Sequence, residues 1–555
     1  MAETRRAFLR SMAAASASVL MSPSLFSLGS VVARTRGTRP NIVLILADDM
    51  GYSDIGCMGS EIPTPNIDKL AAEGILFKNF YNCAKCVPTR GSLLTGLHPH
   101  SSGTDRNGGG LSDANPVVTI AEVLKTAGYA TGMAGKWHLQ ADPFARGFDK
   151  GFIFLGGALS DYWSPDDVVI EGKPWKNSAV DFHFTDGVTD YAVDFINKQS
   201  AATPFFLYTA YTAPHWSRKG LIGQARPDDA QPFKDIYKAG YDAVRQQRYD
   251  RLIAKGLFRP EWKMSPNEAE PWDSLGADAK AESAEEMANH AGLIVQMDRG
   301  IGKILSTLER KGLDDNTLVL FLSDNGASAG SRGFGPGWAN TSCTPFKKYK
   351  KHVHEGGIGT PLLARWPAII PAHGVSERAG HIVDIMATCV EISGAHYPAH
   401  YKGKSIPPCQ GKSLTSAFQG LPDGGHDYLC WEFLGKMAVH KGNWKAIGQS
   451  GYWKELYNLE TDRNETNNLV DKESQKLSEL KSLYDEWWKN NWIVDTHATA
   501  TRTTPSTRQV RLSRHVRLRY GRQRTGGMVY SITGAHLPQS DLHSHCVNIT
   551  MEVRK

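Results

Sequence analysis

The residues around Cys86 form the pattern with the clearest chemical meaning in this chain. Residues 86–96 read Cys-Val-Pro-Thr-Arg-Gly-Ser-Leu-Leu-Thr-Gly, so a thiol lies four residues before an arginine. Cys83 precedes Cys86 at the spacing with which two cysteines share a metal ion or a redox function. A zinc site would need two further ligands at a similar spacing, and the chain has no second Cys-x-x-Cys. A buried structural cysteine is the other simple interpretation.

The whole segment resembles the signature of type I sulfatases, Cys-x-Pro-[Ser/Thr]-Arg-x-x-Leu-x-Thr-Gly. All the fixed positions fall in register, and Thr89 keeps the hydroxyl of the more usual serine. The resemblance implies that Cys86 is oxidised to formylglycine, whose hydrated aldehyde attacks a sulfate ester, and that Arg90 orients this nucleophile. It also implies a formylglycine-generating enzyme as a partner in maturation. The segment therefore predicts a sulfatase.

Acidic and amide side chains follow two apolar runs of the sequence. Asp48-Asp49 ends the first run, and Asp324-Asn325-Gly326 ends the other. An isolated pair of this kind usually caps a helix or forms a turn. Two such clusters also offer hard oxygen ligands, which suit Ca²⁺ or Mg²⁺. The sulfatase resemblance implies a metal site, with Ca²⁺ favoured over Mg²⁺, formed by Asp48, Asp49, Cys86, Asp324 and Asn325.

A sulfate ester is an anion, so a site for it needs cationic donors. Gly135-Lys136-Trp137-His138 supplies a lysine and a histidine whose side chains would point the same way at the end of a strand. The string resembles a sulfatase motif in which Lys136 holds the sulfate and His138 contacts the formylglycine. His215, in Ala-Pro-His, is expected to contact the sulfate, although without the resemblance it reads equally well as a loop histidine.

The last cationic residue belongs to a stretch rich in lysine. Residues 344–357 resemble the family segment in which a lysine lies five residues before Glu-Gly-Gly, and here that lysine is Lys350. A run of lysines is usually a solvated face. If the register shifts, the functional residue is one of three neighbours, Lys347, Lys348 or Lys351. Two further residues are candidates for contact with the substrate, His352 and His354.

The resemblance implies a mechanism in two stages. One hydroxyl of the hydrated formylglycine attacks sulfur, while the metal, Lys136, His215 and Lys350 offset the developing charge. His215 or Lys350 protonates the leaving alcohol, and His138 takes a proton from the second hydroxyl, which expels sulfate. Sulfated carbohydrates are favoured over small aryl sulfates as substrates. Two other functions stay open: a phosphate or phosphonate ester hydrolase of the wider alkaline-phosphatase-like group, and a non-catalytic binder of sulfated glycans.

The elements that must position these residues are typical of an α/β fold. Three apolar runs, 41–47, 205–211 and 317–323, are expected to be strands covered on both faces, and 119–127 and 284–311 to be helices. Open α/β sheets place their sites beyond the carboxyl ends of the strands, so the polar residues after these runs should converge. The resemblance implies a large, mixed, mostly parallel sheet sandwiched by helices, as in the alkaline-phosphatase-like fold.

The chain is expected to contain more than one domain. Residues 39–420 would form the catalytic domain, and 421–494 a smaller α+β subdomain with an antiparallel sheet and a helix. Residues 495–555 form a basic tail, disordered or non-native, to which no function is assigned. Loops 141–185 and 216–280 are expected to determine the choice of substrate, and the second is long enough to wall a cleft.

Composition limits the partners of the chain. Its 555 residues carry a net charge of +6, but eight arginines and no acidic residue lie between 501 and 524. The rest of the chain is therefore nearly neutral and offers no general attraction to nucleic acid. No apolar run is long enough for a stable membrane span.

Residues 1–35 resemble a twin-arginine export signal, because Arg5-Arg6 and Phe8-Leu9 precede an apolar stretch from Met12 to about Leu28. The alternatives are an ordinary secretory signal and a chance pair of arginines. We expect export to the periplasm or the exterior of a bacterial cell, after modification of Cys86 in the cytosol. Disulfides are permitted in that compartment, and the candidates are Cys389, Cys409 and Cys430.

Overall fold

The computed structural model describes the chain from residue 39 to residue 491 with four short gaps, and two segments of the tail. The described ranges are 39–106, 109–111, 116–330, 334–422 and 425–491, with the backbone of 518–522 and 528–532. The expected export signal lies outside them, as does most of the basic tail. The chain divides into two compact units after Thr496, and the described part of the second is an antiparallel hairpin of β18 (Leu518–Arg522) and β19 (Met528–Ile532).

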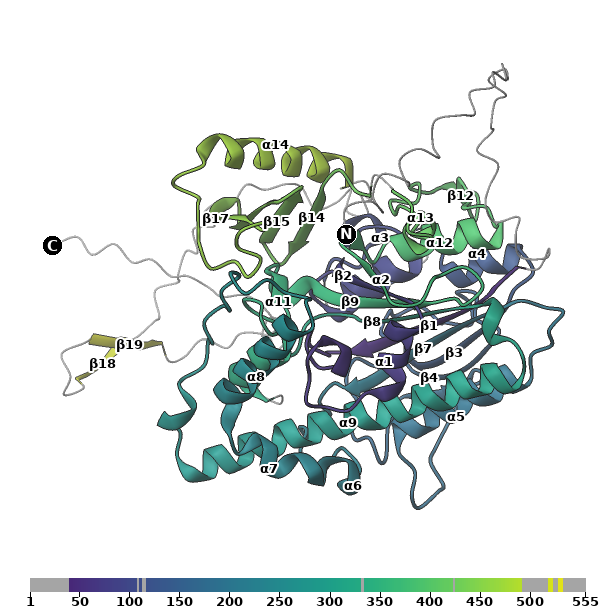
Figure 1. The fold of residues 1–555 in the computed structure, drawn as a ribbon, viewed down its shortest axis with the longest axis horizontal. Helices are drawn as coiled ribbons and strands as arrows, with labels where there is room; N and C mark the ends of the chain where they lie inside the picture. The colour runs from purple at the N-terminus through teal and green to yellow at the C-terminus, as the bar shows by residue number, and fades with distance from the viewer. Residues whose placement is uncertain are drawn as a thin grey trace, which may run out of the picture. The chain divides into compact units, whose positions relative to one another are not determined.

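An 11-stranded sheet forms the centre of the first unit (Figure 1). Its strands follow the order β10-β2-β9-β8-β1-β7-β3-β4-β5-β6, and β11 also pairs with β2. Six of its strand pairs are parallel and four are antiparallel, which confirms the mixed, mostly parallel sheet that the sequence predicts. The strands are β1 (Asn41–Asp48), β2 (Ile75–Tyr81), β3 (Ala130–Lys136), β4 (Lys150–Phe154), β5 (Val168–Ile170), β6 (Lys173–Pro174), β7 (Phe205–Pro214), β8 (Thr317–Ser323), β9 (Gly359–Arg365), β10 (Gly374–Ser376) and β11 (Gly380–His381).

The three strands predicted from apolar runs are β1, β7 and β8, and they lie side by side in the middle of the sheet. Every residue of each is buried. Side chains alternate between two hydrophobic clusters, one on each face: Val43 and Ile45 belong to the first cluster, and Ile42 and Leu44 to the second. Burial on both faces explains why these strands read as unbroken apolar runs.

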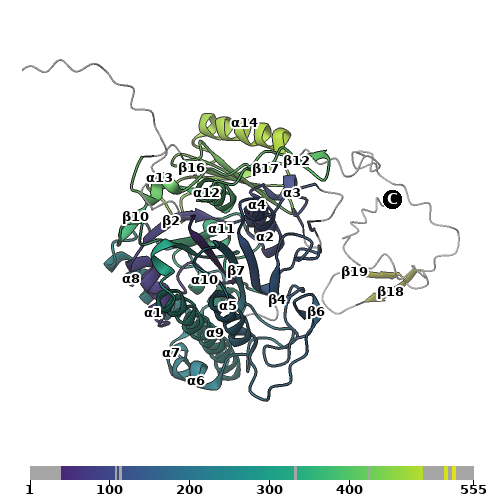
Figure 2. The ribbon, with the colours of Figure 1, turned by 90° about the vertical axis from the view of Figure 1, so that its right-hand side faces the viewer.

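Helices cover both faces of the sheet (Figures 1 and 2). One face packs against α1 (Pro65–Ala72), α5 (Phe184–Asn197) and α9 (Ala277–Arg310), and the other against α2 (Cys86–Thr95), α4 (Ile120–Thr126) and α12 (Asp384–Ser393). The two predicted helices are α4 and α9, and α9 begins earlier than expected. The other helices around the sheet, apart from those of the insertion 216–280, are short. They are α3 (Pro99–Ser102), α10 (Gly335–Ser342), α11 (Glu355–Ile358), α13 (Thr415–Phe418), and the 3₁₀ turns Gly56–Met58 and Asp314–Asn316.

The long insertion 216–280, which we expected to be a loop, is largely helical. It contains α6 (Pro227–Ala230), α7 (Lys234–Tyr237) and α8 (Gly240–Ala254), and it runs into α9. Two 3₁₀ turns, Gln231–Phe233 and Trp272–Ser274, complete it. Tyr237, Tyr241 and Trp272 pack into the core on this face of the sheet, so the insertion is part of the folded body.

The C-terminal part has the antiparallel sheet and helix that the sequence predicts. Four strands, β14 (Leu429–Phe433), β15 (Lys436–Lys441), β16 (Trp444–Gln449) and β17 (Tyr452–Asn458), pair in sequence order. Helix α14 (Ser474–Asn491) lies across one face (Figure 2), where Leu480, Tyr484 and Trp487 are buried. The other face packs against residues of the catalytic part, including Tyr81 and Ile358. A small hairpin of β12 (His400–Tyr401) and β13 (Lys404–Ser405) precedes this sheet.

All seven cysteines in the described part of the chain carry free thiols. The disulfide candidates Cys389, Cys409 and Cys430 are among them, so the structure does not contain the bridges that an exported protein could form. Within the same residues, every helix is too short or too polar to span a bilayer.

Candidate active site

Cys86 is the first residue of α2, and the whole helix is buried. Its side chain is only 1% exposed. The first turn of a helix directs unpaired N–H groups and a partial positive charge outward, which favours an anion at this end. The hydroxyl of Thr89 accepts a hydrogen bond from the N–H of Cys83 at 2.9 Å, which fixes the turn that leads into the helix. This bond explains why the position needs a hydroxyl but accepts threonine as well as serine.

The acidic residues after β1 and β8 meet at Cys86, as the sequence predicts. β1 and β8 are parallel neighbours, and Ala47 pairs with Ser323, so Asp48 and Asp324 leave the sheet side by side. The ligand atoms of Asp48, Cys86 and Asp324 lie within 4.8 Å of one another. The same is true of Asp48, Asp49 and His215.

These residues fit a divalent cation. Asp48 Oδ1 and Asn325 Oδ1 are buried and accept no hydrogen bond, while the amide of Asn325 donates to Asp49 Oδ1 at 2.6 Å. Burial and the nearby charge of Asp48 raise the pKa of Asp324 well above its usual value, despite the opposing effect of Arg90. A cation would relieve this repulsion, and the donors are the carboxylate and amide oxygens that Ca²⁺ and Mg²⁺ prefer.

Three cationic side chains pair with the three carboxylates. Arg90 donates from Nε to Asp324 at 3.0 Å and from Nη1 to the carbonyl of Lys136 at 2.9 Å. Lys136 Nζ contacts Asp48 Oδ2 at 2.5 Å, and Lys350 forms an ion pair with Asp49. The structure thus brings Lys350 into the cluster rather than its neighbours. Lys347 pairs with Glu455 and Lys348 with Glu268, and Lys351 is exposed.

His138 reaches Cys86 in a different way from the one we expected. β3 ends at Lys136, and His138 adopts a left-handed backbone with φ of +61°. The alternation of side chains along a strand therefore does not explain the directions of Lys136 and His138. His138 nevertheless hydrogen-bonds to Cys86, and burial together with Lys136 lowers the pKa of its imidazole. The backbone of Gly157 packs against this ring: a Cβ there would lie 2.5 Å from His138 Nε2.

His215 lies at the end of β7, with Nε2 3.4 Å from Asp49 Oδ2. Its Nδ1 is 2.6 Å from the carbonyl of Trp216, to which it donates a hydrogen bond. Burial lowers the pKa of His215 to about 4, against the opposing effect of Asp49 and Asp48. The two other histidine candidates lie outside this set of contacts, since His354 hydrogen-bonds to Glu455 and His352 packs beside Tyr349.

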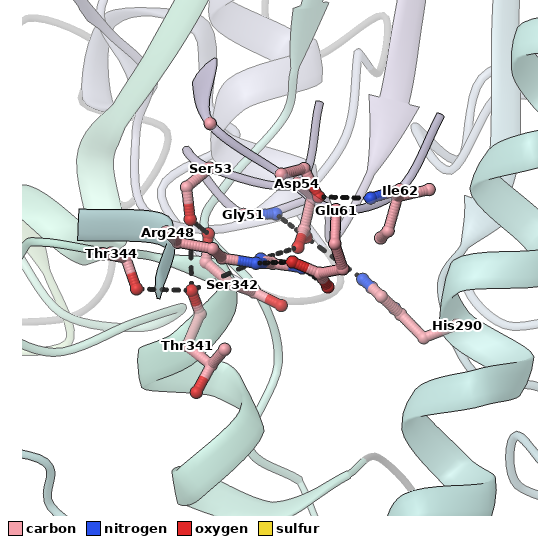
Figure 3. A network of polar contacts seen from close by, with 12 residues as sticks. Gly51, Ser53, Asp54, Glu61, Ile62, Arg248, His290, Thr341, Ser342 and Thr344 are labelled. Carbon is pink, nitrogen blue, oxygen red and sulfur yellow. Dashed lines mark hydrogen bonds and ion pairs between the residues drawn. The ribbon is translucent and has the colours of Figure 1, made fainter. Parts of the chain in front are cut away.

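A buried polar network holds the loop that follows Asp48 and Asp49 (Figure 3). Arg248 of α8 lies between Asp54, at 2.7 Å, and Glu61, at 2.7 Å, and also donates to the carbonyl of Thr341. His290 of α9 contacts the second oxygen of Asp54 at 3.1 Å. The network ties the loop after Asp48 and Asp49 to the end of α10, from which the chain continues to Lys350.

Lys85 is the site residue that our sequence analysis missed. It is the N-cap of α2, it is 9% exposed, and its charge interacts with those of Cys86, Asp49 and Lys350. The available signal was its position directly before Cys86, but an isolated lysine in a sequence is usually a solvated residue. The network of Asp54 and Arg248 was also missed, because its members are 194 residues apart in the chain.

Comparison with known proteins decides the family. A family model described as Sulfatase matches residues 40–395, and a second, described as N-sulphoglucosamine sulphohydrolase, C-terminal, matches residues 346–489. The first match alone spans more than half of the chain. This chain belongs to the sulfatase family. The sulfatase is therefore a sulfuric ester hydrolase, with the sheet and the C-terminal subdomain of its relatives.

Curated and solved relatives support the assignment over most of the sulfatase. It is 31% identical over 433 residues to an arylsulfatase of Klebsiella aerogenes, a match covering 68% of this chain and 92% of the relative. It is 29% identical over 546 residues to an uncharacterized sulfatase of Schizosaccharomyces pombe, a match covering 84% of this chain and 95% of the relative. The crystal structure of Ps i-CgsB in complex with k-i-k-neocarrahexaose superposes with a TM-score of 0.63 at 27% identity. The match covers 82% of this chain and 94% of the solved chain.

Proposed function

We propose that this sulfatase removes sulfate from a sulfated carbohydrate, with residue 86 as formylglycine and a divalent metal, Ca²⁺ ahead of Mg²⁺, beside it. The observation that carries the proposal is the convergence of the Cys86, Asp48 and Asp324 ligand atoms within 4.8 Å at the start of a buried helix. Asp49 and Asn325 complete the set of residues that would hold the metal.

When present, formylglycine would supply a hydroxyl nucleophile through its hydrated aldehyde, and the metal would supply positive charge that makes this hydroxyl easier to deprotonate and neutralises sulfate oxygens. Arg90 is placed to orient side chain 86, because it is fixed by Asp324 and by the carbonyl of Lys136. Lys136, Lys350 and His215 surround the same point and are positioned to donate to the sulfate oxygens.

Two proton transfers can be assigned to residues of this chain. His138 contacts side chain 86 directly and is neutral at pH 7, since burial lowers its pKa, so it can accept the proton that must leave this side chain. The departing alcohol needs a proton in turn. His215 and Lys350 are the donors beside the carboxylates, and an anionic sulfate bound between them would favour their protonated forms.

The preference for carbohydrate rests on a relative. The solved structure with a TM-score of 0.63 contains k-i-k-neocarrahexaose, an oligosaccharide, and its chain is covered almost completely by this one. The sequence of residues 1–35 supports action outside the cytoplasm, where such polymers are found.

The test begins with mass spectrometry of the tryptic peptide containing residue 86, from protein made in a bacterial host that performs the oxidation. An aldehyde at this position is expected. The same preparation would then be offered an aryl sulfate, sulfated monosaccharides and oligosaccharides, and the matching phosphate esters. Release of sulfate from a sulfated sugar supports the proposal. An unmodified thiol in active enzyme would overturn the nucleophile, and a preference for aryl sulfate or for phosphate esters would overturn the substrate.

A further inference from the structure

Lys85 lies next to the nucleophile and beside Lys350, although 265 positions of the chain separate the two lysines. It is the N-cap of α2, with an extended backbone, and it directly precedes Cys86. The N–H of Lys351 donates to the carbonyl of Ala84 at 2.9 Å, so the backbone before Lys85 runs against the backbone after Lys350. The backbone that carries Lys85 therefore lies beside the backbone that carries Lys350, whose side chain pairs with Asp49.

The charges around Cys86 leave Lys85 without a counterion. Asp48 is paired with Lys136, Asp49 with Lys350, and Asp324 with Arg90. Within the described part of the chain, the ammonium group of Lys85 has no carboxylate within 4.0 Å and no hydrogen bond. It is the fourth cation of a cluster that contains three carboxylates.

A buried ammonium without a partner is unfavourable, because it has lost its water and gained no compensating anion. Lys85 is only 9% exposed, and burial, Lys350 and Lys136 lower the pKa of its ammonium group. Cys86 and Asp49 attract this charge and offset the effect only in part. Such a charge is retained at low cost only if an anion occupies the site during function. A divalent metal cannot be this partner, since its own charge would repel Lys85 further.

We propose that the ammonium group of Lys85 binds an oxygen of the sulfate group that is being cleaved, and that Lys85 is a further catalytic residue of this enzyme. The inference rests on the proposed function and extends it by one residue. Negative charge builds up on the sulfate and on the leaving oxygen as the ester bond breaks, so a fixed cation at this place favours the transition state over the bound ester.

The experiment compares Lys85→Met, which keeps the length of the side chain and removes the charge, with Lys85→Arg, which keeps the charge. Lys78→Met is the matched control: Lys78 is mostly buried in β2, seven positions earlier, and pairs with Glu377 at 2.6 Å. For each protein, the fraction of aldehyde at residue 86 is measured by mass spectrometry, and rates are divided by that fraction. The probes are 4-nitrophenyl sulfate for kcat/KM and inorganic sulfate for competitive inhibition.

We expect Lys85→Met to lower the corrected kcat/KM by about 100-fold and to raise the inhibition constant of sulfate by about tenfold. Lys85→Arg should keep both within about tenfold of the wild type, and Lys78→Met should leave both unchanged. The proposal is overturned if corrected values for Lys85→Met stay within about twofold, because Lys85 then acts only in maturation or not at all. It is also overturned if Lys85→Arg lowers the corrected kcat/KM as much as Lys85→Met does and also lowers the melting temperature. That result would mean that Lys85 contributes to packing rather than to catalysis.

Failure of the proposed function is distinguishable from failure of this inference. A wild type that carries the aldehyde and releases no sulfate from any ester contradicts the proposed function. Lys85 is then tested by the rise in melting temperature with added inorganic sulfate. Stabilisation of the wild type but not of Lys85→Met supports an anion site at Lys85, and equal stabilisation of the two proteins overturns it.

Discussion

Cys86 and Cys83 are separated by two residues but have different surroundings. Cys86 faces the carboxylates and contacts His138, whereas the sulfur of Cys83 lies 3.8 Å from His381 Nε2, under the C-terminal sheet. The spacing alone is compatible with a redox pair. The structure instead assigns the two thiols to two different environments, so they should respond differently to substitution.

We expect Cys86→Ala to abolish sulfate release without lowering the melting temperature, because it removes the nucleophile and only one atom of packing. Cys83→Ala should keep both the aldehyde at residue 86 and most of the turnover. Sulfate release and thermal unfolding measured on the two variants check this. Turnover by Cys86→Ala would contradict the proposed nucleophile, and loss of the aldehyde in Cys83→Ala would show that the two thiols cooperate.

Asp324 has the raised pKa of a carboxyl group that shares a buried space with other acids. Asp324→Ala removes a proposed metal ligand, so we expect calcium affinity to fall by about 100-fold or more, and sulfate release to fall with it. Metal content by mass spectrometry and turnover over a calcium titration measure the two effects. Asp315→Ala, at an exposed residue before the opposite end of β8, should change neither. Unchanged calcium binding in Asp324→Ala would mean that Asp-Asn-Gly forms only a turn.

Helix α8 belongs to the insertion 216–280, and its arginines support segments that lead to the active site. Arg248 ties Asp54 and Glu61 to the end of α10, and Arg245, one turn earlier, donates to the carbonyls of Ser265 and Phe346. One helix thus holds both the loop after Asp49 and the segment that leads to Lys350.

Arg248→Met should lower the free energy of unfolding by about 3–5 kcal/mol, because it leaves Asp54 and Glu61 buried with fewer partners. It should also weaken calcium binding, since the loop after Asp49 loses its support. The control is Arg299→Met on α9, where a half-exposed arginine makes a two-pronged pair with Asp229 and the expected loss is about 0–1 kcal/mol. Chemical denaturation measures the loss of stability in both variants. Equal losses in the two variants would contradict a special role for the buried network.

The sequence predicts the elements that carry the site better than those that support it. β1, β7 and β8 are strongly apolar because both faces are buried, and the residues after them converge because parallel strands end at one edge. Arg248 has no such signal, since its partners Asp54 and Glu61 are nearly 200 residues away. His138 and Lys85 show a second limit. A left-handed backbone and an unpaired buried charge result from tertiary packing, and no local pattern encodes them.

The C-terminal sheet is joined to the catalytic part by a buried cluster of charges. Glu355 of α11 is fully buried and contacts Lys445 of β16 at 2.7 Å, and it also pairs with Arg463. Glu465 contacts both Lys445, at 2.8 Å, and the N–H of Glu355. Glu355 lies in the segment that both family models match, and its partners lie in the part that only the second model matches. The contacts make the sheet part of the same cooperative structure.

This cluster predicts a loss of stability in acid. Burial alone would raise the pKa of Glu355, but Arg463 and Lys445 lower it to about 2. An unfolded glutamate has a pKa of about 4.3, so the stabilisation is complete above that pH and is lost as the pH falls towards 2; the difference corresponds to about 3 kcal/mol. Denaturation of Glu355→Gln should show lower stability at pH 7 and a shallower decline between about pH 4.5 and 2. Glu479→Gln, which removes a half-exposed carboxylate of α14 that is paired with Lys441, is the control. A decline as steep as that of the wild type in Glu355→Gln would contradict the assignment.

The burial of α2 bears on when Cys86 can be modified relative to folding. The active site of another enzyme cannot reach residue 86 of the folded protein, because all ten residues of the helix are enclosed and the residue at its start is 1% exposed. If residue 86 becomes formylglycine as proposed, the catalyst that oxidises Cys86 therefore acts on the nascent or unfolded polypeptide. Under the proposed mechanism, we expect folded protein purified from a host without that catalyst to stay inactive when the catalyst is added afterwards.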